Sequence, residues 1–135
     1  MTVEINTAST KYGGTHFTFL DCPGSIEFAQ ETNNALIGAG AAIVVCEPEP
    51  VRVLTLAPLL KFLDDWEIPH IVFINKMDRV CTDETHCKSN FAEVLEALKT
   101  VSNRPIVPHQ YPIAKNNQLI GCLLYTSDAA DDPAS

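Results

Sequence analysis

Hydrophobic residues in the first half of the chain fall into short runs separated by turn residues. Residues 2–10 and 15–21 alternate or run apolar on either side of a turn at 12–14, which predicts a β-hairpin. Continuous apolar runs at 41–46 and 71–74 are typical of strands buried on both faces of a parallel sheet. The pattern therefore predicts two kinds of strand, a hairpin and a buried parallel pair.

Apolar residues at helical spacing lie between and after these strands. Residues 25–36 predict a helix with Ser25 as its N-cap, and residues 91–98 predict a second, clearly amphipathic helix. Residues 51–66 predict a third, in which Pro58 indicates a kink or a later start. Strands that alternate with helices predict an α/β fold with a doubly wound, mostly parallel sheet. Ligands of such a sheet bind beyond the carboxyl ends of its strands.

The C-terminal part follows a different pattern. Residues 106–108 and 110–113 look extended, and Asn116-Asn117 is a plausible turn into a further short strand at 119–120. After Gly121 no pattern can be attached to the fold, and residues 122–135 closely resemble the translation of a transposase adapter used in sequencing libraries. We therefore predict a native domain over 1–121 and a non-native tail over 122–135.

Composition places the chain among ordinary globular proteins. Of its 135 residues, 46% are hydrophobic and 19% are charged, and no apolar run approaches the roughly 20 residues that span a bilayer. The formal net charge of −8 argues against broad electrostatic capture of nucleic acid. We expect no membrane partner and no direct DNA binding, although the charge does not exclude a ribosomal partner met through other domains.

The five cysteines show no paired framework of the kind found in small secreted domains, and a reducing cytosol fits best. This favours a cytoplasmic protein. Cys81, His86 and Cys87 lie close together, but their spacing matches no common structural zinc site. We interpret them as part of a solvated loop with incidental thiols.

The first motif with chemical potential is Asp21-Cys22-Pro23-Gly24, at the end of a predicted strand. A carboxylate there can reach a magnesium ion, often through water, and the glycine amide can closely approach a phosphate oxygen. The helix predicted to follow adds its positive end. The alternative is a plain strand-to-turn junction, in which Asp-x-x-Gly is common.

The second motif, Asn75-Lys76-Met77-Asp78, follows another predicted strand and is more selective. The Asp78 carboxylate can accept both the ring N–H and the exocyclic amine of guanine, a pairing that adenine cannot offer. The Lys76 stem can lie over the base, and Asn75 can tie neighbouring loops together. The alternative is a polar strand end with a Lys–Asp ion pair. The order of the two motifs, with one helix–strand–helix–strand passage between them, favours a guanine-nucleotide site.

With both motifs, residues 17–78 resemble the GTP-binding domain of translation elongation factor G, and the similarity runs from about residue 2 to 121. It is nearest to the elongation factor G-like branch, in which Ser follows Pro-Gly. The resemblance implies a translational GTPase of the P-loop type that binds GTP/GDP with Mg²⁺, acts on the ribosome and hydrolyses GTP. It assigns the magnesium and γ-phosphate side to Asp21 and Gly24, and the base to Asn75, Lys76 and Asp78. It aligns Thr2 with a magnesium-binding threonine.

Three departures from the family pattern bear on activity. Ser25 stands where the family usually has a histidine that positions the attacking water, and a hydroxyl can orient water but lacks the charge and reach of an imidazole. No Gly-x-x-x-x-Gly-Lys-Ser/Thr loop occurs in the 135 residues. No second guanine-contacting loop of the Ser-Ala type is recognisable either.

We therefore expect a partial domain that lacks its first strand and phosphate loop, truncated at both ends, with Met1 an internal methionine. Without the cradle of backbone amides, the isolated chain should be poorly stable, bind GTP weakly and be inactive as an enzyme. The rival interpretation is a non-hydrolysing or slowly hydrolysing GTP-binding regulatory module, which Ser25 would permit.

Overall fold

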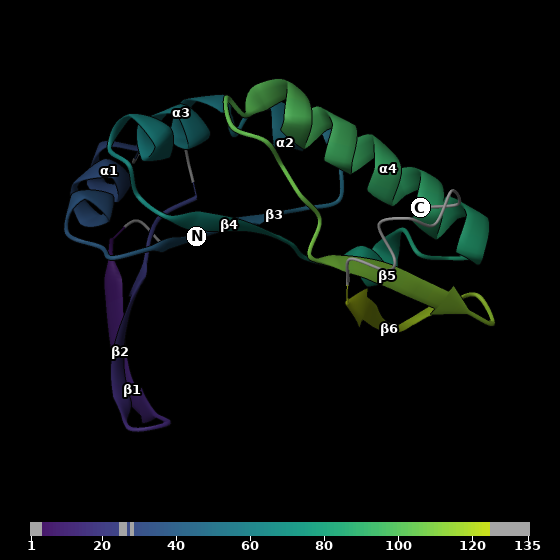
Figure 1. Cartoon of the computed structure of the whole chain (residues 1–135), viewed down its shortest axis with the longest axis horizontal. Helices are drawn as coiled ribbons and strands as arrows, with labels where there is room; N and C mark the ends of the chain where they lie inside the picture. Colours follow the sequence, from purple (N-terminus) through teal and green to yellow (C-terminus); the bar gives the residue numbers. More distant parts are fainter. Residues whose placement is uncertain (1–3, 25–26, 28, 125–135) are drawn as a thin grey trace.

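The computed structural model of the chain describes residues 4–24, 27 and 29–124, and its strands form three separate two-stranded sheets (Figure 1). The strands are β1 Asn6–Tyr12, β2 Thr15–Asp21, β3 Ala42–Cys46, β4 His70–Ile74, β5 Gln110–Lys115 and β6 Gln118–Leu124. The helices are α1 Ala29–Ile37, α2 Pro50–Leu54, α3 Ala57–Asp65 and α4 Glu84–Val101, with the 3₁₀ turn η2 at Met77–Arg79. Mixed helix and strand content fits the predicted α/β class.

The first two strands form the predicted antiparallel hairpin, paired from Asn6 opposite Asp21 to the turn. Gly13 and Gly14 both have positive φ, as a tight two-residue hairpin turn requires. The hairpin projects away from the other elements (Figure 1). Its second strand does not lead into a buried sheet edge, since Phe17 and Phe19 are 42% and 52% exposed. The reason is that the hairpin pairs with no other strand in the described structure.

The second sheet is the predicted parallel pair, β3 with β4. The expectation that both of its faces are buried is wrong: Val44 is 4% exposed, whereas Ile43 and Val45 are each 58% exposed, and Ile71 and Phe73 on β4 are also exposed. Successive side chains of a strand point to opposite faces, and the helices lie along one side of this sheet only (Figure 1). The other face is therefore open.

The helix predicted over 51–66 is broken into α2 and α3. Pro58 lies in the first turn of α3, where a missing backbone N–H costs little, so it marks a later helix start. Leu60 and Leu63 of α3 are fully buried and pack with Val44 of β3 in one core cluster. This cluster holds α3 on the covered face of the parallel pair.

The predicted first helix is confirmed over Ala29–Ile37, and it ends where Gly38 donates its N–H to the Ala35 carbonyl at 3.1 Å. Residues 25, 26 and 28 lie outside the described residues, so the N-cap predicted at Ser25 does too.

The last helix, α4, is longer than the 91–98 predicted from its apolar stripe. Asp83 caps its N-terminus by accepting the His86 N–H at 2.8 Å, which satisfies a donor that has no partner within the helix. Val94 and Leu98 pack with Cys46 and Val53 in a second cluster. This contact sets α4 beside the carboxyl end of β3.

The C-terminal hairpin turns at Asn116 and Asn117, both in the left-handed region, as predicted. Strand β6 continues beyond Gly121 to Leu124, which pairs with Gln110 of β5. The expectation that no pattern attaches to the fold after Gly121 is therefore wrong for residues 122–124. The non-native origin of 122–135 stays a prediction.

Cys81 and Cys87 form a disulfide and are fully buried, in a third cluster with Met77 and Ala114. This corrects the interpretation of these residues as incidental thiols in a solvated loop. Cys87 belongs to α4, and the cluster joins this helix to Met77 of η2 and Ala114 of β5. Within the described residues, no helix is both long and apolar enough to cross a bilayer.

Candidate nucleotide-binding site

The segment Asn75–Asp78 turns sharply away from the end of β4. The Asn75 N–H donates to the Cys46 carbonyl at 2.8 Å, which extends the parallel ladder by one bond, and its Oδ1 accepts the Lys76 N–H at 2.9 Å. Lys76 adopts the left-handed conformation, with φ 61° and ψ 31°, immediately before η2. Non-glycine residues held in this region are frequent at binding sites.

In this turn one side chain of the motif is buried and another is exposed to solvent. Met77 is 8% exposed and packs into the third core cluster, whereas Asp78 is exposed at the start of η2. The apolar anchor fixes the turn, and the carboxylate next to it remains free to accept hydrogen bonds from a ligand.

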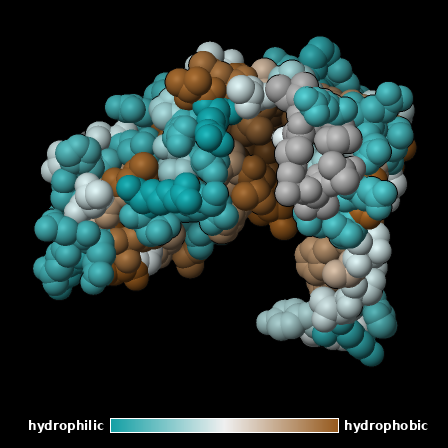
Figure 2. Space-filling view, turned by 180° about the vertical axis from the view of Figure 1, so that it is seen from behind, coloured by the Kyte–Doolittle hydropathy of each residue, from teal (hydrophilic) through white to brown (hydrophobic). Residues whose placement is uncertain are grey.

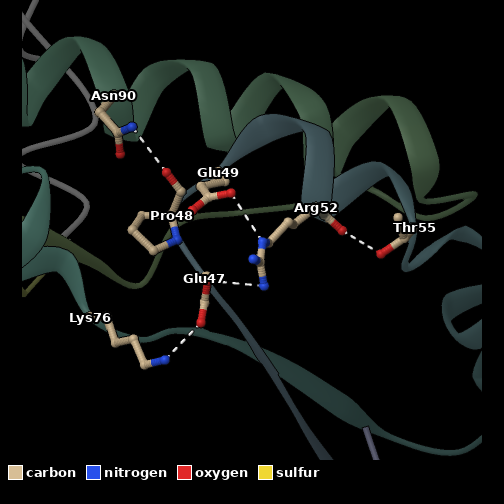
Figure 3. Close-up of polar contacts among 7 residues, drawn as sticks. All are labelled: Glu47, Pro48, Glu49, Arg52, Thr55, Lys76 and Asn90. Atoms are coloured by element: carbon tan, nitrogen blue, oxygen red, sulfur yellow. Dashed lines mark hydrogen bonds and ion pairs between the residues drawn. The ribbon is translucent and has the colours of Figure 1, made fainter. Parts of the chain in front are cut away.

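The Lys76 ammonium is paired with a residue that the sequence did not single out. Its Nζ donates to Oε1 of Glu47 at 2.7 Å, and Arg52 Nη1 lies 3.2 Å from the second oxygen of the same carboxylate (Figure 3). The hydrogen bond from Lys76, with the charges of Arg52, Lys76 and Arg79, lowers the pKa of Glu47. Glu47 therefore stays ionised and holds two cations at the carboxyl end of β3.

The loop that carries Glu47 is braced from two sides (Figure 3). Arg52 Nε donates to Glu49 Oε2 at 3.0 Å, and Asn90 Nδ2 of α4 donates to the Pro48 carbonyl at 3.0 Å. Pro48 itself is buried. Sequence reasoning missed this network, and the available signal was weak: Glu47 is the first polar residue after an apolar strand.

The other motif begins where β2 ends. Asp21 is exposed and lies opposite Asn6, and Pro23 is buried with its carbonyl accepting the Thr32 hydroxyl of α1 at 3.1 Å. Burial, and then the nearby Asp21 charge, raises the pKa of the Cys22 thiol. The thiol between Asp21 and Pro23 is therefore kept protonated at neutral pH.

Gly24 has no conformational reason to be glycine in this structure. Its φ is not positive, and a Cβ built on it would meet no atom of the described residues within 4 Å. Space for the close approach of a ligand remains a reason for glycine at this position.

The structure does not bring the two motifs together. Among the described residues, no hydrogen bond or ion pair joins 21–24 to 75–78, and β2 and β4 belong to different sheets. The hairpin lies at the end of the parallel sheet away from α4, whereas β4 leads toward α4 (Figure 1). Thr2 and Ser25, the other predicted site residues, lie outside the described residues.

Comparison with known proteins identifies the family. The chain matches the elongation factor Tu GTP binding domain over residues 1–130, which is nearly its whole length. It belongs to this family. The resemblance noted from the two motifs is thereby confirmed, and the chain is a GTP-binding domain of the translation-factor type.

Two relatives illustrate where this domain occurs. The chain is 60% identical, over 121 residues, to an elongation factor G-like protein of Synechocystis, covering 90% of the chain and 17% of that relative. It is 28% identical, over 123 residues, to the mitochondrial ribosome-releasing factor 2 of Drosophila ananassae, covering 87% of the chain and 16% of the relative. The chain thus spans about a sixth of either relative. No solved structure matches it.

Proposed function

We propose that this domain binds guanine nucleotides through Asn75–Asp78 as part of a translational GTPase of the elongation factor G-like kind. The observation that carries the proposal is the anchored turn after β4, which buries Met77 and leaves the Asp78 carboxylate exposed. The family to which the chain belongs supports the same ligand. In this proposal Asp78 accepts the guanine N–H groups, the Lys76 stem lies over the base and Asn75 fixes the turn.

The phosphate side of the proposed site consists of Asp21 and Gly24, with Thr2 as a further magnesium ligand. No group of three or more His, Cys, Asp or Glu side chains that could hold a metal occurs among the described residues. Mg²⁺ bound to nucleotides commonly takes only one or two protein carboxylates and completes its shell with phosphate and water, so a lone exposed Asp21 fits. Mg²⁺ would neutralise phosphate charge there, and Gly24 would leave room for the γ-phosphate.

The doubly wound, mostly parallel P-loop GTPase sheet belongs to the same proposal. The open face of β3 and β4 supports it, because Ile43, Val45 and Ile71 are apolar side chains of the kind that such a sheet covers with helices. In the described residues, β2 and β3 each have one edge that pairs with no strand, which supports it as well.

For the whole protein, we propose GTP hydrolysis on the ribosome in the cytoplasm, with water as the nucleophile and Ser25 orienting it. A relative is named as a ribosome-releasing factor, which supports a ribosomal partner. The second candidate is a GTP-binding regulator that hydrolyses slowly or not at all, favoured by a serine in place of the usual histidine. Turnover of the longer protein that ribosomes leave unchanged would support the regulator.

The binding proposal is tested by titrating the 135-residue chain with GDP and ADP while following its amide NMR signals. We expect millimolar or high-micromolar affinity for GDP, because the sequence contains no phosphate loop, and weaker binding of ADP. Asp78→Asn should weaken GDP binding by about tenfold or more, since an amide cannot accept both guanine N–H groups. Xanthosine diphosphate, which offers a carbonyl to the new amide, should bind this variant better than GDP does.

Asp65→Asn is the matched control, because among the described residues Asp65 forms an ion pair with Lys61 of α3 alone. It should bind GDP as the unmodified chain does. Equal binding of GDP and ADP, or an Asp78→Asn variant that retains full GDP affinity, would overturn the assignment of the base site.

A further inference from the structure

We propose that Glu47 is a positioning residue for guanine binding, which acts by holding the Lys76 side chain in its base-contacting place. The inference rests on the proposed function of Asn75–Asp78 and adds a residue that lies outside that motif. Glu47 is separated from Lys76 by 29 positions in sequence, yet the two side chains meet at 2.7 Å (Figure 3). In the described part of the chain, Lys76 makes no other ion pair.

The contact follows from the register of the parallel pair. Cys46 lies opposite Ile74, and the next ladder bond runs from Asn75 to the Cys46 carbonyl at 2.8 Å. Glu47 is therefore level with Asn75, and Lys76, the next residue, leaves the same edge of the sheet within reach of the Glu47 carboxylate.

The Glu47 carboxylate is held before any ligand arrives. Its second oxygen lies 3.2 Å from Arg52 Nη1, and its side chain is 23% exposed, against 41% for Lys76. The loop behind it is fixed by the hydrogen bond from Asn90 to the Pro48 carbonyl. Glu47, the more buried residue of the pair, therefore fixes the position of the more exposed Lys76 ammonium.

Lys76 is consequently anchored at both ends. The left-handed turn fixes its backbone, and Glu47 fixes its ammonium. The methylene groups between these two points therefore have few conformations available. This stem is the part that lies over the base in the proposed site. A lysine side chain that is ordered before binding loses less conformational entropy when the ligand binds than a free side chain does. The smaller entropy loss makes the free energy of binding more favourable.

The test compares Glu47→Gln with Glu96→Gln in the 135-residue chain. Glu96 is the matched control, because it pairs at 2.9 Å with Lys99 of the same helix, α4, and belongs to no part of the network around Glu47 described above. Acylation of Lys76 by an amine-reactive ester, followed by mass spectrometry, should become about threefold faster in Glu47→Gln, as expected for a partly exposed pair. GDP affinity, from amide NMR titration, should fall by about the same factor. Neither should change in Glu96→Gln.

A second background separates positioning from a merely structural effect. In a Lys76→Met chain, which keeps the stem but has no ammonium, Glu47→Gln should cause no further loss of GDP affinity. An equal additional loss there would overturn the inference, as would unchanged or tighter GDP binding in the single Glu47→Gln variant. If the unmodified chain itself shows no GDP binding, the proposed function fails, and the inference fails with it.

Discussion

At the scale of one residue, a substitution at Gly24 should affect ligand binding without affecting folding. Within the part of the chain that the structure describes, a methyl group there would meet no atom within 4 Å, and the backbone does not need positive φ. We expect Gly24→Ala to leave the free energy of unfolding unchanged or to raise it by about 0.5 kcal/mol, because alanine has less entropy to lose on folding. The same methyl should obstruct a γ-phosphate and lower the ratio of GTP to GDP affinity by about fivefold.

Gly40→Ala provides the control, since Gly40 also has open space around it and no positive φ. Its stability should respond in the same way, and its GTP to GDP ratio should not change. Urea unfolding and parallel nucleotide titrations measure the two quantities. A Gly24→Ala chain that distinguishes the nucleotides as before would show that Gly24 does not face the γ-phosphate.

The residues that sequence alone could predict are those whose chemistry is local. Asn75–Asp78 was recognisable because all its members are consecutive and follow an apolar strand. Glu47 was not, because its contact with Lys76 depends on the pairing of β3 with β4, which the sequence around Glu47 does not indicate. Gly24 was recognisable as part of a motif, but only the structure shows that the fold itself leaves the position free.

At the scale of elements, the Cys81–Cys87 disulfide joins the segment after η2 to the first turns of α4. It lies a few residues beyond the proposed guanine motif and packs on Met77. Closing so short a loop should contribute about 2 kcal/mol to stability by restricting the unfolded chain. We expect a reductant to lower the free energy of unfolding by about this amount, as measured by urea titration followed by circular dichroism.

A Cys81→Ala/Cys87→Ala chain supplies the control for this prediction. Its stability should be low with or without reductant, whereas a Cys122→Ser chain should still respond, because Cys122 is a free, exposed thiol. If the reductant has no effect on the unmodified chain, the two thiols are not joined in solution.

The elements themselves were predictable to different degrees. The hairpin turns, the parallel strands and the amphipathic stripe of α4 follow from local patterns and were predicted near their observed places. The helix break at Pro58 was foreseen as one of two possibilities, and the structure shows the later start. The disulfide was missed because a spacing of six residues in a chain with five cysteines indicates no particular pairing.

At the scale of the whole molecule, the described residues enclose three small core clusters and leave a broad apolar surface open. Figure 2 shows hydrophobic residues gathered in the hollow between the two ends of the molecule. Continuous apolar runs led us to expect strands buried on both faces, because hydrophobicity alone cannot indicate whether a covering layer is present. The exposed face lies on β3 and β4, where Ile43 pairs with Ile71, and Val45 with Phe73.

Substitutions on this open face should affect stability less than substitutions in the core. Ile43 is 58% and Ile71 62% exposed, whereas Leu60 is fully buried. Replacing either isoleucine by threonine keeps a β-branched side chain in the strand and should lower the free energy of unfolding by less than about 1 kcal/mol. Leu60→Ala, which opens a cavity in the first cluster, should cost about 3 kcal/mol.

The same isoleucine variants should reduce self-association, because exposed apolar surface of this kind drives contacts between copies. Sedimentation velocity across a range of protein concentrations measures this, and urea unfolding at the lowest concentration measures stability without it. If Ile43→Thr destabilises the chain as strongly as Leu60→Ala even in dilute solution, the face is covered within the monomer. If Ile43→Thr instead leaves both self-association and stability unchanged, the apolar face of β3 and β4 does not form contacts between copies. The expected result, reduced association at nearly constant stability, would show that the chain folds around the helix-covered face of its parallel strands, and that the other face is not needed for folding but is available for contacts between copies.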